Sequence, residues 1–284
     1  MTEKTGCCRG KLIVSDIDGT FKWWEPGLRP GEIGISPRNI EALSRFRAEG
    51  GRFTFATGRI SGSLEQVVPG FREYVNAPVI GCNGAYIYDP ETESFPVIRP
   101  VDSLYVLRGL SRIHELYPQL TMWIHTVGQR IPLFAHRPDF TLDGWCKAMV
   151  SAWTCGEPAN HSDPLEEDVG ALNEARGVLE ELYGDTVAFS KSCPQLLELL
   201  DPEATKGKMI APLKEVLSCR GFETDTVYAV GDYENDLELL SYADVKACPD
   251  NAIDAVKEKC GVHLVKCSDG AIGDLIDKIM NGEC

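Results

Sequence analysis

The apolar and polar positions in the first third of the chain predict short strands that alternate with helices. Short apolar runs predict strands at 11–16, 52–57 and 78–82. A short helix is predicted at 61–68, between the second and third of these strands. This β-α-β-α-β order is typical of a parallel sheet that carries helices on its faces.

A longer helix is predicted between the first two strands. Its start is indicated by Ser36, which can cap a helix, and by Pro37, which suits the first helical turn. Ile40, Leu43 and Phe46 follow at spacings of three, which predicts that they share one buried helical face.

The last third of the chain repeats this alternation. Its apolar runs predict strands at 226–230, 244–247 and 262–266. Helices are predicted at 206–220, 234–242, 251–259 and 271–280. Pro212 falls inside the first of these helical patterns, so it either kinks that helix or marks a later start.

The middle third has a different pattern, which predicts a second unit of α+β type. Its predicted elements are a hairpin at 85–101, a helix at 103–117, a strand at 121–127, a helix at 165–183 and a strand–turn–strand at 186–200. We therefore expect an α/β protein with a Rossmann-like, three-layer parallel sheet. The core is predicted to be discontinuous, over 1–83 and 196–284, with an α+β cap domain inserted at 84–195.

Composition and charge exclude several classes of function. The chain has 284 residues, with hydrophobic and charged fractions of 43% and 25%, as in ordinary folded proteins. Its net charge of −15 argues against a nucleic-acid partner and against a basic membrane-binding surface. No apolar run approaches the ~20 residues of a membrane span, and none has the length of a signal-peptide core. We therefore expect a cytoplasmic protein, and the sequence indicates no oligomeric state.

The cysteines and histidines do not form a recognisable metal or redox pattern. The 11 cysteines are scattered, and no pair has the C-x-x-C spacing of a zinc site or redox dithiol. The histidines are scattered too, and we assign no role to His114, His125 or His136.

Acidic residues follow two of the predicted strands. Asp16-Ile17-Asp18-Gly19-Thr20 comes directly after the first strand, and Gly19 would allow a sharp turn. Carboxylates two residues apart on an extended segment point the same way. The alternative interpretation of this segment is an ordinary acidic turn.

The second acidic group follows the strand at 226–230. Asp232, Asn235 and Asp236 supply the hard oxygen donors that Mg²⁺ prefers. Helix capping would also explain these residue types. However, two acidic strand ends in one parallel sheet can converge on one metal ion.

Two weaker signals point to phosphate binding. Thr57-Gly58-Arg59 follows the second strand, where a hydroxyl and free backbone N–H groups can hold phosphate oxygens. Lys206 precedes a glycine at a predicted helix start and could reach an anion. Taken alone, the first is an ordinary turn and the second a solvated charge.

The order of these motifs resembles that of the haloacid dehalogenase superfamily, and its aspartyl phosphatases most closely. The shared order is strand–D-x-D-G-T, strand–T-G-R, a lysine before a helix, and strand–G-D-x-x-N-D. The tract 83–89 and the insertion between the second and third motifs resemble the Cof subfamily, which has a cap domain in that position. The resemblance spans nearly the whole chain but is weak within 90–185. Two departures are Phe21, where the family often has Leu, and 266–270, which matches a late family motif only in part.

The resemblance implies a role for each motif residue. Asp16 would be the nucleophile that forms an aspartyl phosphate, and Asp18 the general acid and base. Thr57 and Lys206 would hold the transferring phosphoryl group. The remaining phosphate- or substrate-binding residues would be Gly19, Gly58, Arg59 and Asn235. Mg²⁺ would be bound by Asp16, the Asp18 carbonyl and Asp232, with Asn235 and Asp236 in support.

The sequence therefore predicts a Mg²⁺-dependent phosphomonoester hydrolase that acts on a small phosphorylated metabolite, with sugar phosphates the first expectation. A phosphomutase is the alternative within enzymes, but such relatives usually carry a small helical cap early in the chain. Here only 36 residues separate Asp18 from Thr54, and the large insertion comes later. A non-catalytic sensor of a phosphorylated metabolite is the second alternative. It should have lost a catalytic carboxylate, and this chain keeps them all.

Overall fold

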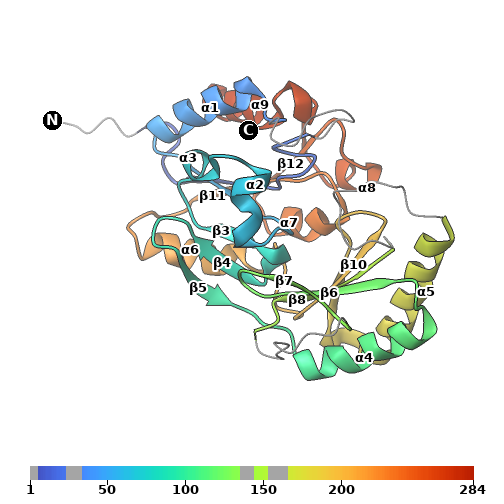
Figure 1. Ribbon diagram of the computed structural model, residues 1–284. Coiled ribbons are helices and arrows are strands. Elements are labelled where there is room, and N and C mark those ends of the chain that lie inside the picture. The colour runs from blue at the N-terminus through green and yellow to red at the C-terminus, as the bar shows by residue number, and fades with distance from the viewer. Residues whose placement is uncertain (1–5, 24–33, 135–143, 153–165) are drawn as a thin grey trace.

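The computed structural model describes residues 6–23, 34–134, 144–152 and 166–284, which form two layered units (Figure 1). Parallel strands flanked by helices make up one unit, in the upper part of Figure 1. An antiparallel sheet with helices on its outer face makes up the other. This arrangement confirms the predicted α/β class with an added α+β unit.

The upper unit, called the core here, is built on a parallel sheet. Among the described residues its strand order is β13-β12-β11-β1-β2. These strands are β1 (Lys11–Ser15), β2 (Arg52–Phe55), β11 (Thr226–Val230), β12 (Val245–Pro249) and β13 (Val262–Leu264). Because β1 pairs in parallel with β11, Ser15 lies beside Val230. The segments that follow these two strands therefore leave the sheet side by side.

Helices cover both faces of the core sheet because its strands alternate their apolar side chains. Ile13 packs into the cluster that contains Phe46 and Leu275, whereas Leu12 and Val14 pack into the opposite cluster. The first face carries α1 (Pro37–Ala48), α2 (Leu64–Val67), α3 (Phe71–Tyr74) and α9 (Ala271–Asn281). The second face carries α6 (Ile210–Ser218), α7 (Leu237–Ser241) and α8 (Asp254–Lys257).

Helix α1 has the predicted position but not the predicted face. Ile40 is 43% exposed, and Asn39 is buried in its place. Since each residue turns a helix by about 100°, Ile40 and Phe46 lie about 120° apart and cannot both face the sheet. Ser36 precedes the helix as predicted, but its hydroxyl makes no capping hydrogen bond. In the last third, α6 starts late, which decides between the two interpretations of Pro212.

The predicted hairpin extends the core. Strands β3 (Val79–Gly81), β4 (Tyr86–Asp89) and β5 (Ser94–Ile98) form an antiparallel sheet. A parallel bridge between Ala56 and Ile80 joins it to the end of β2.

The lower unit, called the cap here, is an antiparallel sheet with two helices on its outer face. Among the described residues its strand order is β7-β6-β8-β10-β9. Its elements are α4 (Ser103–Leu116), β6 (Thr121–His125), β7 (Arg130–Pro132), β8 (Lys147–Ser151), α5 (Glu166–Tyr183), β9 (Ala188–Ser190) and β10 (Leu196–Leu200). The sequence analysis did not predict β7 or β8. Helices α4 and α5 lie on the side of the sheet away from the core (Figure 1).

Sheet membership bears on the two domain boundaries. The hairpin β4–β5 belongs with β3, although it lies inside the predicted insertion at 84–195. Strand β10 belongs to the cap sheet, although it lies inside the predicted core segment at 196–284. We therefore propose cap boundaries near 100 and 200. No helix in the described part of the chain is both long and apolar enough to cross a membrane.

Candidate active site

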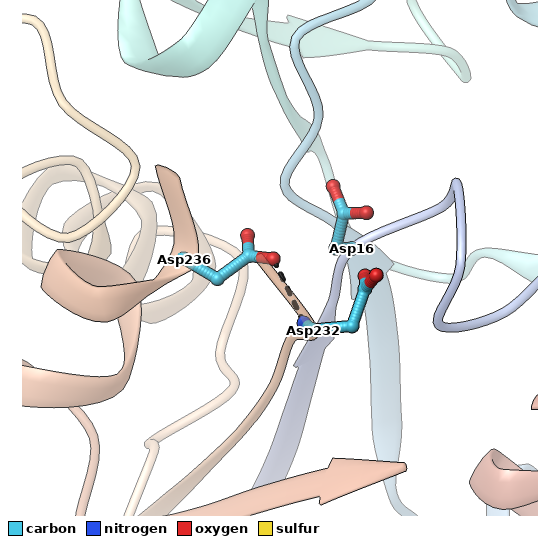
Figure 2. Close-up of side chains that lie close together, drawn as sticks. All are labelled: Asp16, Asp232 and Asp236. Atoms are coloured by element: carbon cyan, nitrogen blue, oxygen red, sulfur yellow. Dashed lines mark hydrogen bonds between the residues drawn. The ribbon is translucent and has the colours of Figure 1, made fainter. Parts of the chain in front are cut away.

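Three carboxylates meet where β1 and β11 end. Asp16 follows β1, Asp232 follows β11, and Asp236 lies in the short helical turn before α7. One oxygen from each residue lies within 4.8 Å of the others, and Figure 2 shows the three side chains converging. The predicted convergence of two acidic strand ends is therefore present.

Hydrogen bonds fix the segment that carries Asp232. The Asp236 Oδ2 atom accepts from the backbone N–H of Asp232 at 3.0 Å and of Tyr233 at 3.2 Å (Figure 2 shows the first). Thr20 donates its hydroxyl to Asp232 Oδ1 at 2.7 Å, which joins the first acidic motif to the second. Asp236 thus holds the backbone of the site in place and also contributes to its negative charge.

The turn after Asp18 requires glycine. Gly19 has φ +90°, in the region that favours glycine, and a Cβ there would lie 2.3 Å from Asp232 Oδ2. A side chain at this position would therefore displace Asp232.

Lys206 neutralises part of this negative charge. It is 2% exposed, and its Nζ donates to Asp16 Oδ1 and to Asp236 Oδ1, each at 2.7 Å. Burial by itself would lower the pKa of Lys206, but the two carboxylates outweigh it and raise that pKa. Lys206 is therefore a fixed positive charge at the back of the site.

The carboxylates still exceed the positive charge around them. Burial raises the pKa of Asp16 well above its ordinary value, against the effect of Lys206. Burial and the nearby Asp236 charge raise the pKa of Asp232 to about 7. Oxygen donors with excess negative charge are the donor set that Mg²⁺ takes, so the residues present fit this ion.

Asp18 is paired with Arg59 and is not one of the three clustered carboxylates. Its oxygens accept from Arg59 Nε at 2.9 Å and from an Arg59 terminal nitrogen at 3.0 Å, a two-point ion pair that is half-exposed. Burial opposes the shift, but the Arg59 guanidinium prevails and lowers the pKa of Asp18. The structure thus places Asp18 and Arg59 together, beside the cluster.

The turn Thr57-Gly58-Arg59 follows β2 and is held by its own hydrogen bonds. Thr57 is buried, and its Oγ1 accepts from the backbone N–H of Arg59 at 3.1 Å. The backbone N–H of Asn83 donates to the Thr57 carbonyl at 2.8 Å. Among the described residues, none accepts a hydrogen bond from the Thr57 hydroxyl.

Asn83 lies beside the predicted site residues, although the sequence analysis gave it no role beyond its place in the tract 83–89. It is 3% exposed with φ 56°, and its Oδ1 accepts from Asn235 Nδ2 at 3.4 Å. Asn235 is therefore held by Asn83, although the sequence predicted it as support for the metal. The one local sequence signal for the Asn83 conformation is the Asn-Gly pair after β3, because asparagine tolerates the left-handed region of backbone angles.

A small cavity lies beside Lys206, between β9 of the cap and α7 of the core. Its volume is about 100 Å³. Polar residues that line it include Asn83, Ser190, Lys206, Glu234 and Asn235. Arg176 on α5 of the cap approaches Glu234 of the core to 3.5 Å, which links the two units next to this cavity.

Among the described residues, no histidine belongs to the carboxylate cluster. His125 is buried in the cap sheet, and neither ring nitrogen has a hydrogen-bond partner among the described residues. His114 stacks on Phe134 with ring centres 4.4 Å apart. His136 lies outside the described residues.

Known proteins resemble this chain over most of its length. A family model described as haloacid dehalogenase-like hydrolase matches residues 13–103 and 157–276. The 5-amino-6-(5-phospho-D-ribitylamino)uracil phosphatase YwtE of Bacillus subtilis is 24% identical, over 96% of this chain and 99% of its own. The pyridoxal phosphate phosphatase YbhA of Escherichia coli is also 24% identical, over 89% of this chain and 93% of its own.

A solved structure shares the fold. The subclass IIB sugar phosphatase BT4131 superposes with a TM-score of 0.68 and 18% identity, over 94% of this chain and 98% of that one. At this identity the likeness shows the fold alone, and it agrees with the predicted α/β fold class. The family match covers most of the chain and confirms the resemblance found in the sequence. The chain therefore belongs to the haloacid dehalogenase-like hydrolases.

Proposed function

We propose that this enzyme is a Mg²⁺-dependent phosphomonoester hydrolase that works through an aspartyl phosphate on Asp16. The observation that carries the proposal is the setting of Asp16. Its Oδ1 is held by Lys206, whereas its Oδ2 accepts no hydrogen bond from the described residues. One oxygen is thus anchored and the other is available to attack phosphorus.

A carboxylate nucleophile divides one difficult displacement into two easier ones. Asp16 Oδ2 would attack the phosphorus atom in line with the leaving alcohol, and the phosphorus–oxygen bond to that alcohol would break. Water would then attack the phosphorus of the aspartyl phosphate, which releases inorganic phosphate and restores Asp16. Positioning and charge neutralisation supply most of the catalysis in such transfers.

The metal site would use the carboxylates of Asp16 and Asp232, together with the Asp18 carbonyl, and would leave Asp16 Oδ2 to attack phosphorus. Both oxygens of Asp236 are already engaged by Lys206 and by backbone N–H groups, so Asp236 supports the site. When bound, Mg²⁺ would neutralise charge and so allow one anion to approach another.

The transferring phosphoryl group would lie between Asp16 and the turn after β2. We expect the Thr57 hydroxyl and the backbone N–H groups of this turn to donate to its oxygens. Lys206, which donates to Asp16 Oδ1, would add a fixed positive charge.

Asp18 would serve as the general acid and base. Its pairing with Arg59 favours the ionised form, which suits the base that activates water. To protonate the leaving alcohol, Asp18 must first gain a proton, so we expect Arg59 to turn toward the substrate in that step.

The substrate is proposed to be a small phosphorylated metabolite, with sugar phosphates foremost. The named relatives support this size class, since they are phosphatases of a ribitylamino-uracil phosphate, pyridoxal phosphate and sugar phosphates. The small polar cavity beside Lys206 also suits a compact, hydrogen-bonding leaving group.

Two alternatives on the same fold remain distinguishable from this proposal. A phosphomutase would return the phosphoryl group to a second hydroxyl and release no phosphate. A sensor would bind a phosphorylated metabolite without turnover.

The test is the variant Asp16→Asn, assayed for Mg²⁺-dependent release of phosphate from 4-nitrophenyl phosphate. We expect a loss of about 10³-fold or more, because the nucleophile is removed. The exposed residue Asp185, changed to Asn, is the matched control and should keep full activity. Full activity in Asp16→Asn would show that the assignment is wrong.

A further inference from the structure

The cap carries a buried ion pair that the proposed reaction does not use directly. Lys147 on β8 and Glu198 on β10 are 1% and 2% exposed, and Lys147 Nζ contacts Glu198 Oε1. Replacing a buried ion pair with apolar residues of similar volume is often neutral or stabilising. The pair therefore needs an explanation other than the stability of the cap.

Strand alternation turns this pair toward the core. The neighbours Ala148, Leu197 and Leu199 pack in the cap cluster under α4 and α5. Successive side chains of a strand point to opposite faces, so Lys147 and Glu198 project from the other face of the sheet. That face meets the core at the turn after β2 and at Asn83.

Each member of the pair contacts a different core segment. Lys147 Nζ donates to the carbonyl of Gly58 at 2.9 Å. Glu198 Oε2 accepts from Asn83 Nδ2 and from Ser192 Oγ, the latter at 2.6 Å. The ion pair thus joins the turn after β2 to Asn83 through the cap sheet.

The bridge also sets the orientation of the Asn83 amide. Because Glu198 is an acceptor, the amide nitrogen of Asn83 must face it, and Asn83 Oδ1 then faces Asn235 Nδ2. Space is limited here, since a Cβ on Gly58 would lie 3.1 Å from Asn83 Oδ1. A flipped or displaced Asn83 would therefore disturb both Gly58 and Asn235.

We propose that Lys147 and Glu198 are positioning residues: through Gly58 and Asn83 they hold the phosphate-binding turn and Asn235 in place for phosphoryl transfer. The proposal rests on the proposed function. It makes the cap part of the catalytic framework, because two core motifs are joined through a cap ion pair.

The test compares two double variants in which no buried charge is left alone. Lys147→Met with Glu198→Leu removes both charges and both contacts to the core. Lys147→Met with Glu198→Gln removes both charges but keeps an acceptor for Asn83. The control is Arg112→Met with Glu115→Gln, which removes an exposed ion pair within helix α4 of the cap.

Three quantities are measured: the unfolding temperature, kcat and KM with 4-nitrophenyl phosphate, and the affinity for inorganic phosphate with Mg²⁺ in the Asp16→Asn background. We expect the Met/Leu variant to unfold near the wild-type temperature and to lose tenfold or more in kcat/KM and in phosphate affinity. A displacement of 1 Å can cost about 10²-fold. The Met/Gln variant should recover part of both losses, and the control should match the wild type.

Wild-type values of kcat/KM and phosphate affinity in a folded Met/Leu variant would overturn the proposal. If that variant does not fold, the Met/Gln variant decides. Of the two contacts with the core it loses only the one to Gly58, and its kcat/KM and phosphate affinity should still fall below the wild-type values. Phosphate affinity needs no turnover. A wild-type protein without phosphatase activity would therefore refute the proposed function, while the affinity comparison would still decide the positioning role.

Discussion

Removing the Lys206 charge tests whether the carboxylate cluster depends on it. In Lys206→Met, Asp16 and Asp236 each lose an ion pair with a length of 2.7 Å, in a site where Lys206 is 2% exposed. Breaking a buried pair by removing one partner costs about 3–5 kcal/mol, because a buried charge is left uncompensated. We expect a loss of this size in the free energy of unfolding near pH 8 without divalent cations.

The loss should depend on pH in a definite direction. Without Lys206, the pKa values of Asp16 and Asp232 rise further above the unfolded value of about 3.9, because Lys206 lowers both in the wild type. The folded state then binds more protons than the unfolded chain, so its stability falls as pH rises from about 4 through the raised values. The difference in the free energy of unfolding between Lys206→Met and the wild type should therefore be smaller at pH 5 than at pH 8. Mg²⁺ should reduce this difference at pH 8.

Urea unfolding followed by circular dichroism, with EDTA or with Mg²⁺, measures these differences. Lys208→Met is the matched control: Lys208 pairs with the exposed Glu203 at 2.9 Å, and surface pairs contribute about 1 kcal/mol at most. Equal stability of Lys206→Met and the wild type at pH 8 in EDTA would refute the reasoning about uncompensated charge.

Three further predictions concern the turn, the acid–base pair and the metal. Gly19→Ala should weaken Mg²⁺ affinity and activity, because its Cβ meets Asp232. The control Gly221→Ala, at φ +77° with open space around it, should leave both unchanged. A Mg²⁺ titration of activity compares the two variants. Arg59→Met should raise the pKa of Asp18, which carboxyl-carbon NMR titration measures, and a fall would contradict the pairing. In EDTA, the free energy of unfolding of the wild type should fall by roughly 2–4 kcal/mol between about pH 4 and pH 7, because the folded pKa of Asp232 is about 7. Mg²⁺ should remove this pH dependence. A flat pH profile in EDTA would count against the raised pKa of Asp232.

The parts of the site that follow strands could be predicted from the sequence. A short apolar run ending in Asp16 and another ending near Asp232 indicate two strand ends, and parallel pairing brings such ends to one edge of a sheet. The order of helices and strands in the core follows from apolar periodicity in the same way. Periodicity was less reliable for the face of α1, where Ile40 is exposed.

The residues that connect the cap to the core could not be predicted. Lysine is almost never fully buried, so the sequence alone predicts that Lys147 lies on the surface. Its partner Glu198 lies 51 residues away, and no local pattern signals that the two strands meet. The contacts of Asp18 and Asn235 were also beyond the sequence. Motif order suggests their neighbourhood, but only packing decides that Asp18 meets Arg59 and that Asn235 meets Asn83.

The most direct test of the central claim is chemical trapping of the intermediate. The wild-type enzyme is mixed with Mg²⁺ and a phosphorylated substrate, quenched in acid, and treated with borohydride, which reduces an acyl phosphate to an alcohol. Peptide mass spectrometry then identifies the modified residue. We predict homoserine in place of Asp16, dependent on substrate and Mg²⁺. Turnover without modification of Asp16, or with modification of another residue, would contradict the account.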